Sequence, residues 1–224
     1  MNFELKTFDL SSAAIEKCDA LIVLLGQSFK PADDVLSTLV AQALKAKDLE
    51  TKAGKTLVLY RASGLACTRA VLAGIGDGSA KDVRQAVSAA VSAVKSSNVK
   101  KVLICFAALP DAQALRAALV GVAEASYVFT TTKSKPEGRV IQRVVVGVPD
   151  APTFKPVFDR AVAAVAGIEF AKEWANRPAN HATPTLLAGA AQSLAKLANI
   201  TCEVLGPKEV AKLGMGSFMA VAQG

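Results

Sequence analysis

The sequence has little of what usually identifies a function. One histidine, His181, and 5% aromatic residues occur in 224 residues, of which 52% are hydrophobic. Every role for an imidazole therefore depends on one side chain. The cysteines are far apart and form no Cys-x-x-Cys pair, which is typical of buried reduced thiols and excludes a zinc ribbon or a disulfide scaffold. They are Cys18, Cys67, Cys105 and Cys202.

Long hydrophobic runs are also missing. The apolar run of residues 20–27 is far shorter than the roughly 18–20 residues that cross a bilayer. The first residues do not combine a basic segment with a long apolar region, as a secretory signal would. We therefore expect no transmembrane helix, no membrane partner and a cytoplasmic location.

Basic residues exceed acidic ones, with 26 Lys and Arg against 19 Asp and Glu and a net charge of +7. The densest basic stretch contains Lys133, Lys135, Arg139 and Arg143, offset by Glu137. Such a cluster can neutralise nucleic-acid phosphates, although a solvated loop is the commoner explanation. DNA is therefore an alternative partner rather than the preferred one.

Apolar runs that predict strands alternate with amphipathic segments that predict helices. This alternation is typical of a mostly parallel sheet between helices, and we assign residues 1–148 to one α/β domain. After an opening segment with partial alternation, the predicted strands are residues 20–25, 56–62, 69–75, 99–107 and 139–148. The predicted helices begin near Pro31, at Ser79 and at Asp111.

The second part of the chain begins after a proline-rich stretch. Three prolines within residues 149–156 predict a linker that holds neither a helix nor a central strand. Together with a predicted helix over 157–176 they form a linker and connecting helix, residues 149–176. Residues 177–224 predict the beginning of a second α/β domain, with a helix from Pro184 to Asn199 and a strand over 200–205. One strand cannot easily close a core, so we expect a fragment or a dependence on further sequence.

Motifs for phosphate chemistry are weak. Gly54-Lys55-Thr56 lacks the earlier glycine of a P-loop and precedes a predicted strand instead of a helix. Residues 74–78, Gly-Ile-Gly-Asp-Gly, follow a strand and precede a helix, where backbone amides can hold an anion. A tight turn is the commoner explanation of such glycines. His181 lies in a polar loop, and the carboxylates are scattered along the sequence. The residue types alone therefore do not identify an active site.

Two linked motifs carry a resemblance to a known family. Residues 176–184 read Asn-Arg-Pro-Ala-Asn-His-Ala-Thr-Pro, and residues 213–224 read Leu-Gly-Met-Gly-Ser-Phe-Met-Ala-Val-Ala-Gln-Gly. At this spacing they resemble the start of the catalytic domain of the leucyl (cytosol) aminopeptidases. The segments 53–55, 69–76 and 127–133 resemble that family's N-terminal domain more loosely.

The resemblance implies a macro-domain-like N-terminal α/β domain, a long connecting helix and a catalytic domain with two divalent metal ions, manganese or zinc. It also implies peptide substrates and a homo-hexamer. The family's metal-binding segments do not occur here, so no catalytic, cofactor-binding or metal residue is assigned, and we expect this piece to be inactive and to serve in assembly or binding. The matched residues Asn176, Pro178, Asn180 and Pro184 are given a structural role. The alternatives are a nucleotide or ADP-ribose binding module and a DNA-binding domain.

Overall fold

The computed structural model describes residues 1–95 and 98–223. The chain divides into two compact units, Met1–Ala171 and Lys172–Gly224, and the division falls within one helix, α5 (Ala151–Ala175). Each unit is therefore considered by itself. No helix among the described residues is long and apolar enough to span a bilayer.

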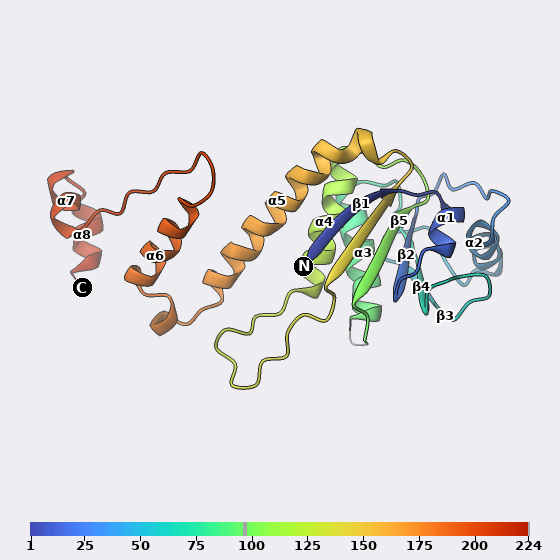
Figure 1. The fold of residues 1–224 in the computed structure, drawn as a ribbon, viewed down its shortest axis with the longest axis horizontal. Coiled ribbons are helices and arrows are strands. Elements are labelled where there is room, and N and C mark those ends of the chain that lie inside the picture. Colours follow the sequence, from blue (N-terminus) through green and yellow to red (C-terminus); the bar gives the residue numbers. More distant parts are fainter. Residues whose placement is uncertain (96–97, 224) are drawn as a thin grey trace. The chain divides into compact units, whose positions relative to one another are not determined.

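The first unit is built on a six-stranded sheet in the order β1-β6-β5-β2-β4-β3 (Figure 1). All neighbours are parallel except β3, which runs antiparallel to β4. The predicted mostly parallel sheet between helices is confirmed. The strands are β1 (Asn2–Thr7), β2 (Ala20–Leu25), β3 (Thr56–Tyr60), β4 (Arg69–Gly74), β5 (Lys101–Phe106) and β6 (Arg143–Val148).

Helices cover both faces of this sheet. On one face, buried side chains of α3 (Ala80–Val94), α4 (Ala112–Ser126) and α5 form one apolar cluster with the strands. On the other face, α1 (Leu10–Ile15) and α2 (Val35–Ala46) form a second cluster (Figure 1). The central strand β2 is buried at all six residues, because a parallel strand covered on both faces has no solvent side.

Helix starts follow the capping residues. Ser79 and Asp111 are the N-caps of α3 and α4, as predicted, and each side chain accepts a backbone N–H of the first turn. The predicted start of α2 near Pro31 was wrong by several residues. Asp34 is the N-cap and accepts the Ser37 N–H, and the helix begins at Val35. A side chain that satisfies an otherwise unpaired amide marks the start better than a proline does.

The proline-rich stretch does hold a helix, so the prediction that residues 149–156 form a linker without helix was wrong. Helix α5 begins at Ala151 and contains Pro156. Pro152 stands in the first turn, where its missing N–H has no intrahelical partner in any case. Pro156 removes one hydrogen bond, which burial of the Phe154 and Phe158 side chains at 8% and 5% exposure offsets.

The regular elements among the described residues of the second unit are all helical. This unit contains the 3-10 turn η1 (Ala179–His181) and the helices α6 (Pro184–Leu194), α7 (Pro207–Lys212) and α8 (Gly216–Ala222). The strand predicted over 200–205 was wrong, since this segment has no regular structure. A strand needs a partner for its backbone groups, and the described part of 172–223 contains none. Helix α6 also ends at Leu194, earlier than the predicted Asn199.

The start of α1 gives a pH-dependent prediction. The Asp9 carboxylate accepts hydrogen bonds from the hydroxyl and N–H of Ser12, which lower its pKa from 3.8 to about 2. Because the folded value lies below the unfolded one, this stabilisation is present above pH 3.8 and is lost as the pH falls towards about 2. We expect Asp9→Ala to lower the free energy of unfolding by about 1 kcal/mol at pH 7. In urea denaturation, the difference from the wild type should shrink as the pH falls through about 2. Ser92→Ala, at an exposed serine of α3 on the other face of the sheet, is the control.

Candidate functional site

A cleft lies at the carboxyl end of the sheet, where loops from three parallel strands meet. It has a volume of about 450 Å³. This is the edge at which open α/β sheets usually bind ligands, and the volume falls within the usual range for small-molecule sites. Its lining includes Gly26, Gln27, Gly76, Asp77, Leu109 and Asp111.

The glycine-rich turn of residues 74–78 forms part of this cleft, but its amides are already used. The Gly74 N–H donates to Lys55 O at 2.9 Å, and the Gly76 N–H donates to Thr51 O at 2.8 Å. The Gly78 N–H donates to Ile75 O at 2.8 Å. Gly76 and Gly78 have φ values of 57° and 86°, which explains these glycines by backbone conformation. The turn therefore presents no row of free amides to an anion.

Carboxylates occupy the helix starts that face the same edge. Asp77 accepts the Ser79 N–H at 2.9 Å, and Asp111 accepts the Ala114 N–H at 2.6 Å. The partial positive charge of each helix start is thereby neutralised from within the chain. A phosphate in the cleft would meet negative charge, and these contacts do not favour the nucleotide-binding alternative.

Two of the four matched residues in the loop of residues 176–184, Asn176 and Pro184, lie at helix ends. The Asn176 amide donates to Lys172 O at 2.8 Å at the end of α5. Thr183 is the N-cap of α6 and accepts the Leu186 N–H at 3.3 Å, and Pro184 stands in the first turn. Asn180 and His181 are exposed in η1. The loop thus joins two helices with side-chain caps on both sides.

Arg177 of this loop lies against side chains of the preceding helix. Its guanidinium lies 3.9 Å from the centroid of the Trp174 ring and 3.2 Å from a Glu173 oxygen. Its Nε is buried without a hydrogen-bond partner among the described residues. The side chain is held by an aromatic face and a carboxylate one helical turn away.

The basic cluster of residues 133–143 does not form a single surface. Arg139 donates to the Ser126 and Ala123 carbonyls at 3.0 and 3.1 Å and to Glu169 at 2.5 Å, and its side chain is 15% exposed. Arg143 pairs with Glu4. Two of the four cations are therefore neutralised within the first unit, which weakens the case for DNA as a partner.

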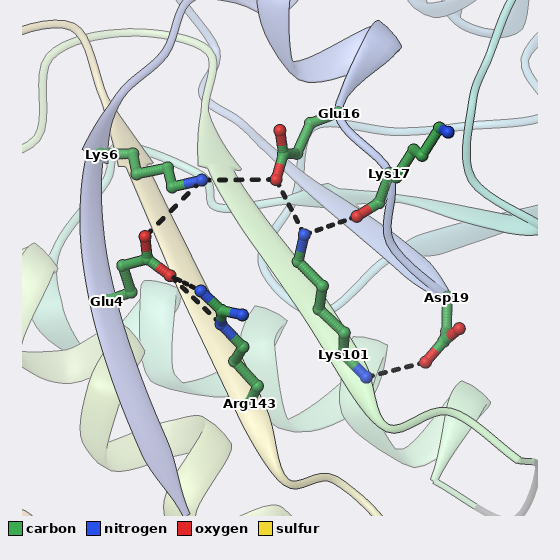
Figure 2. Close-up of polar contacts among 7 residues, drawn as sticks. All are labelled: Glu4, Lys6, Glu16, Lys17, Asp19, Lys101 and Arg143. Carbon is green, nitrogen blue, oxygen red and sulfur yellow. Dashed lines mark hydrogen bonds and ion pairs between the residues drawn. The ribbon is translucent and has the colours of Figure 1, made fainter.

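Sequence reasoning missed a charged network near the amino ends of β5 and β6, shown in Figure 2. The Glu16 carboxylate accepts a hydrogen bond from the Lys101 ammonium at 2.8 Å and forms an ion pair with Lys6 at 3.5 Å. Glu4 forms ion pairs with Lys6 and Arg143. These hydrogen bonds, from Lys101 to Glu16 and from Arg143 to Glu4, lower the pKa of both glutamates. No sequence signal announces this network, because its members come from four distant segments.

Asp19 ties the network to the sheet. Its carboxylate accepts the backbone N–H groups of Lys100 and Lys101, both at 2.8 Å, as β5 begins. The Lys101 ammonium reaches the Lys17 carbonyl (Figure 2). Both glutamates of the network are thus neutralised by cations of the same unit.

The donor set for a metal ion is not assembled in the described residues. Nowhere in 1–95 and 98–223 do three His, Cys, Asp or Glu side chains come together in a way that could hold one. Because a catalytic metal needs about three protein ligands, these residues do not fit the divalent metals that the resemblance implies. We derive no catalytic step from them.

Comparison with known proteins connects both units to one group of enzymes. Residues 23–136 match the family model described as cytosol aminopeptidase family, N-terminal domain. Residues 169–224 match the model described as cytosol aminopeptidase family, catalytic domain. The two matches follow one another in the order of the two structural units.

Curated relatives cover the whole of this chain but are about twice as long. A probable cytosol aminopeptidase of Albidiferax ferrireducens is 76% identical over 224 residues, which are 100% of this chain and 47% of that protein. One from Polaromonas sp. is 60% identical over 227 residues, 100% of this chain and 45% of that protein. This chain therefore spans about half the length of these relatives.

Solved structures share the fold. A mutant of tomato leucine aminopeptidase superposes with a TM-score of 0.75 at 20% identity, covering 96% of this chain and 46% of that chain. The bottromycin maturation enzyme BotP, in complex with Mn, gives 0.66 at 20% identity, covering 88% of this chain and 40% of that chain. At this level of identity, the comparison speaks for the fold alone.

Proposed function

Because this chain belongs to the cytosol aminopeptidase family, we propose that it is the N-terminal portion of a metal-dependent aminopeptidase that removes residues such as leucine from the amino termini of peptides. The observation that supports this proposal is that the chain matches the family's N-terminal domain and then, in the same order, the first part of its catalytic domain. The first unit then contains the family's N-terminal domain and most of the connecting helix. The second is the opening of the catalytic domain.

The surface of the second unit supports this proposal. Among its described residues, only Ala190 and Val210 are buried. Such a segment cannot supply a hydrophobic core of its own. Ten of the sixteen large apolar side chains exposed in the described chain lie here: Leu186, Leu187, Leu197, Ile200, Val204, Leu205, Leu213, Met215, Phe218 and Val221.

An exposed apolar surface of this kind is completed by further protein. In our proposal, the covering protein is the remainder of the catalytic domain, which the longer relatives possess. The divalent ions, manganese or zinc, are bound by residues outside those described here. We further propose that the protein assembles into a homo-hexamer and is located in the cytoplasm.

The proposed domain limits are residues 1–148 for the N-terminal domain, 149–176 for the linker and connecting helix, and 177–224 for the beginning of the catalytic domain.

A comparison of two proteins tests the function. The full-length protein should hydrolyse leucine p-nitroanilide in the presence of manganese, lose this activity to a chelator and recover it on addition of metal. The 224-residue chain should show no turnover above buffer under the same conditions. Chelator-sensitive turnover by the chain alone would overturn the placement of the metal ligands. Inactivity of the full-length protein towards all aminoacyl p-nitroanilides would overturn the function itself.

A further inference from the structure

Two of the free cysteines face each other just before two neighbouring parallel strands. Strands β2 and β4 pair in a register that sets Ala20 opposite Arg69. Continued outward by two residues, the same register sets Cys18 opposite Cys67. At the position between, the Thr68 hydroxyl donates a 2.7 Å hydrogen bond to the Asp19 carbonyl. The two cysteine-bearing segments are therefore held side by side.

Their packing places both sulfurs in one environment. Cys67 is 5% exposed within the apolar cluster that α1 and α2 cover, and the half-buried Cys18 packs against that cluster. Neighbouring strands lie about 4.8 Å apart. Disulfide-bonded residues have Cα atoms about 4.4–6.8 Å apart, so the register brings these residues within bonding range.

The two thiols also interact. The contact between the two sulfurs, assisted by backbone N–H groups, lowers the pKa of Cys67. The same contact and burial raise the pKa of Cys18. Cys67 is therefore the sulfur that loses its proton first, and the thiolate is the form that reacts with oxidants.

We propose that Cys18 and Cys67 are a dithiol modification site, which a hydroperoxide oxidises reversibly to a disulfide. The Cys67 thiolate attacks hydrogen peroxide, the O–O bond breaks, and the departing hydroxide takes up a proton to give water. Cys67 is then a sulfenic acid. The Cys18 sulfur attacks the Cys67 sulfur, the S–S bond forms, and the sulfenic oxygen leaves as a second water with the Cys18 proton. Two electrons pass from the thiols to the peroxide.

The disulfide would close a loop that contains β2, α2 and β3. It restricts the unfolded chain, and for a loop of this length we expect the Tm of the N-terminal domain to rise by on the order of 10 °C. A thiol reductant should reverse the change by exchange at the accessible Cys18 sulfur. The site is independent of the proposed peptidase chemistry.

Peptide mapping tests the proposal. The full-length protein is treated with hydrogen peroxide, the remaining thiols are alkylated, and peptides are analysed without reduction. We expect a linked peptide pair joining Cys18 to Cys67, which disappears after treatment with dithiothreitol. The Cys18→Ser variant should lack the link, while Cys105→Ala and Cys202→Ala should keep it. Burial raises the pKa of the Cys105 thiol to about 12, so this cysteine should resist oxidation.

A second measurement on the unaltered protein keeps the result independent of variant folding. Phenylarsine oxide, which bridges paired thiols, should protect Cys18 and Cys67 together from alkylation. Independent sulfinic acids at Cys18 and Cys67 after peroxide, or alkylation of both in the presence of the arsenical, would overturn the proposal.

Discussion

Replacing Gly74 with alanine is expected to lower the free energy of unfolding by about 3 kcal/mol, near the upper end for an overpacked core position. A Cβ atom at Gly74 would lie 2.4 Å from Lys52 O and 2.6 Å from Glu50 O. These are backbone atoms of a segment that crosses the end of β4. Two hydrogen bonds hold this segment next to Gly74, from the Gly74 N–H to Lys55 O at 2.9 Å and from the Gly54 N–H to Gly74 O at 3.1 Å. The segment therefore cannot move away from an added Cβ atom without breaking them.

Urea denaturation followed by circular dichroism measures this change. Gly167→Ala in α5 is the matched control, because nothing lies within 4 Å of a Cβ atom built there. In that helix the extra methyl group should stabilise by about 0.5–1 kcal/mol. Equal effects of the two substitutions would contradict the steric argument, and so would a loss at Gly74 below about 0.5 kcal/mol.

Replacing Arg139 with methionine should destabilise the first unit by about 2–3 kcal/mol. The methionine keeps most of the apolar stem but removes a charged group that is 15% exposed and bound to Glu169. It also leaves the Ser126 and Ala123 carbonyls without this donor at the end of α4. Breaking a largely buried pair leaves its partner uncompensated, which is why the expected loss exceeds that of a surface pair.

Arg143→Met is the matched control from the same basic segment. Its side chain is 54% exposed in the pair with Glu4, and exposed pairs contribute at most about 1 kcal/mol and are screened by salt. Urea denaturation at low and high salt should therefore show a persistent loss for Arg139→Met and a small, vanishing one for Arg143→Met. The reverse ranking would show that Arg139 is not the buried anchor of this segment.

Much of the fold follows from local patterns. The apolar run of residues 20–25 predicted β2 with its observed limits, and Ser79 and Asp111 predicted the starts of α3 and α4. The two linked motifs after residue 175 led to the family that the comparisons then showed. These predictions succeed because a buried strand, a capped helix start and a short motif each depend on residues close together in the chain.

The errors share one physical cause, since each depended on a partner that local sequence does not contain. Residues 200–205 have the composition of a strand, but the described part of the second unit contains no strand to pair with them. Pro156 is tolerated in α5 because Phe154 and Phe158 are buried against the sheet. Within the basic run of residues 133–143, Arg139 pairs with Glu169 and Arg143 pairs with Glu4. Both glutamates come from distant parts of the chain.

The sequence by itself determined the α/β class of the first unit, most of its helix and strand positions and the family. Only the tertiary structure decided which backbone amides and side chains remain available to bind a ligand or to react. It directed the amides of Gly74, Gly76 and Gly78 to backbone carbonyls. The pairing of β2 with β4, extended outward by two residues, sets Cys18 opposite Cys67. Periodicity and capping are local and can be read along the chain. Hydrogen-bond satisfaction and side-chain pairing depend on register between distant segments, which forms only when the sheet assembles.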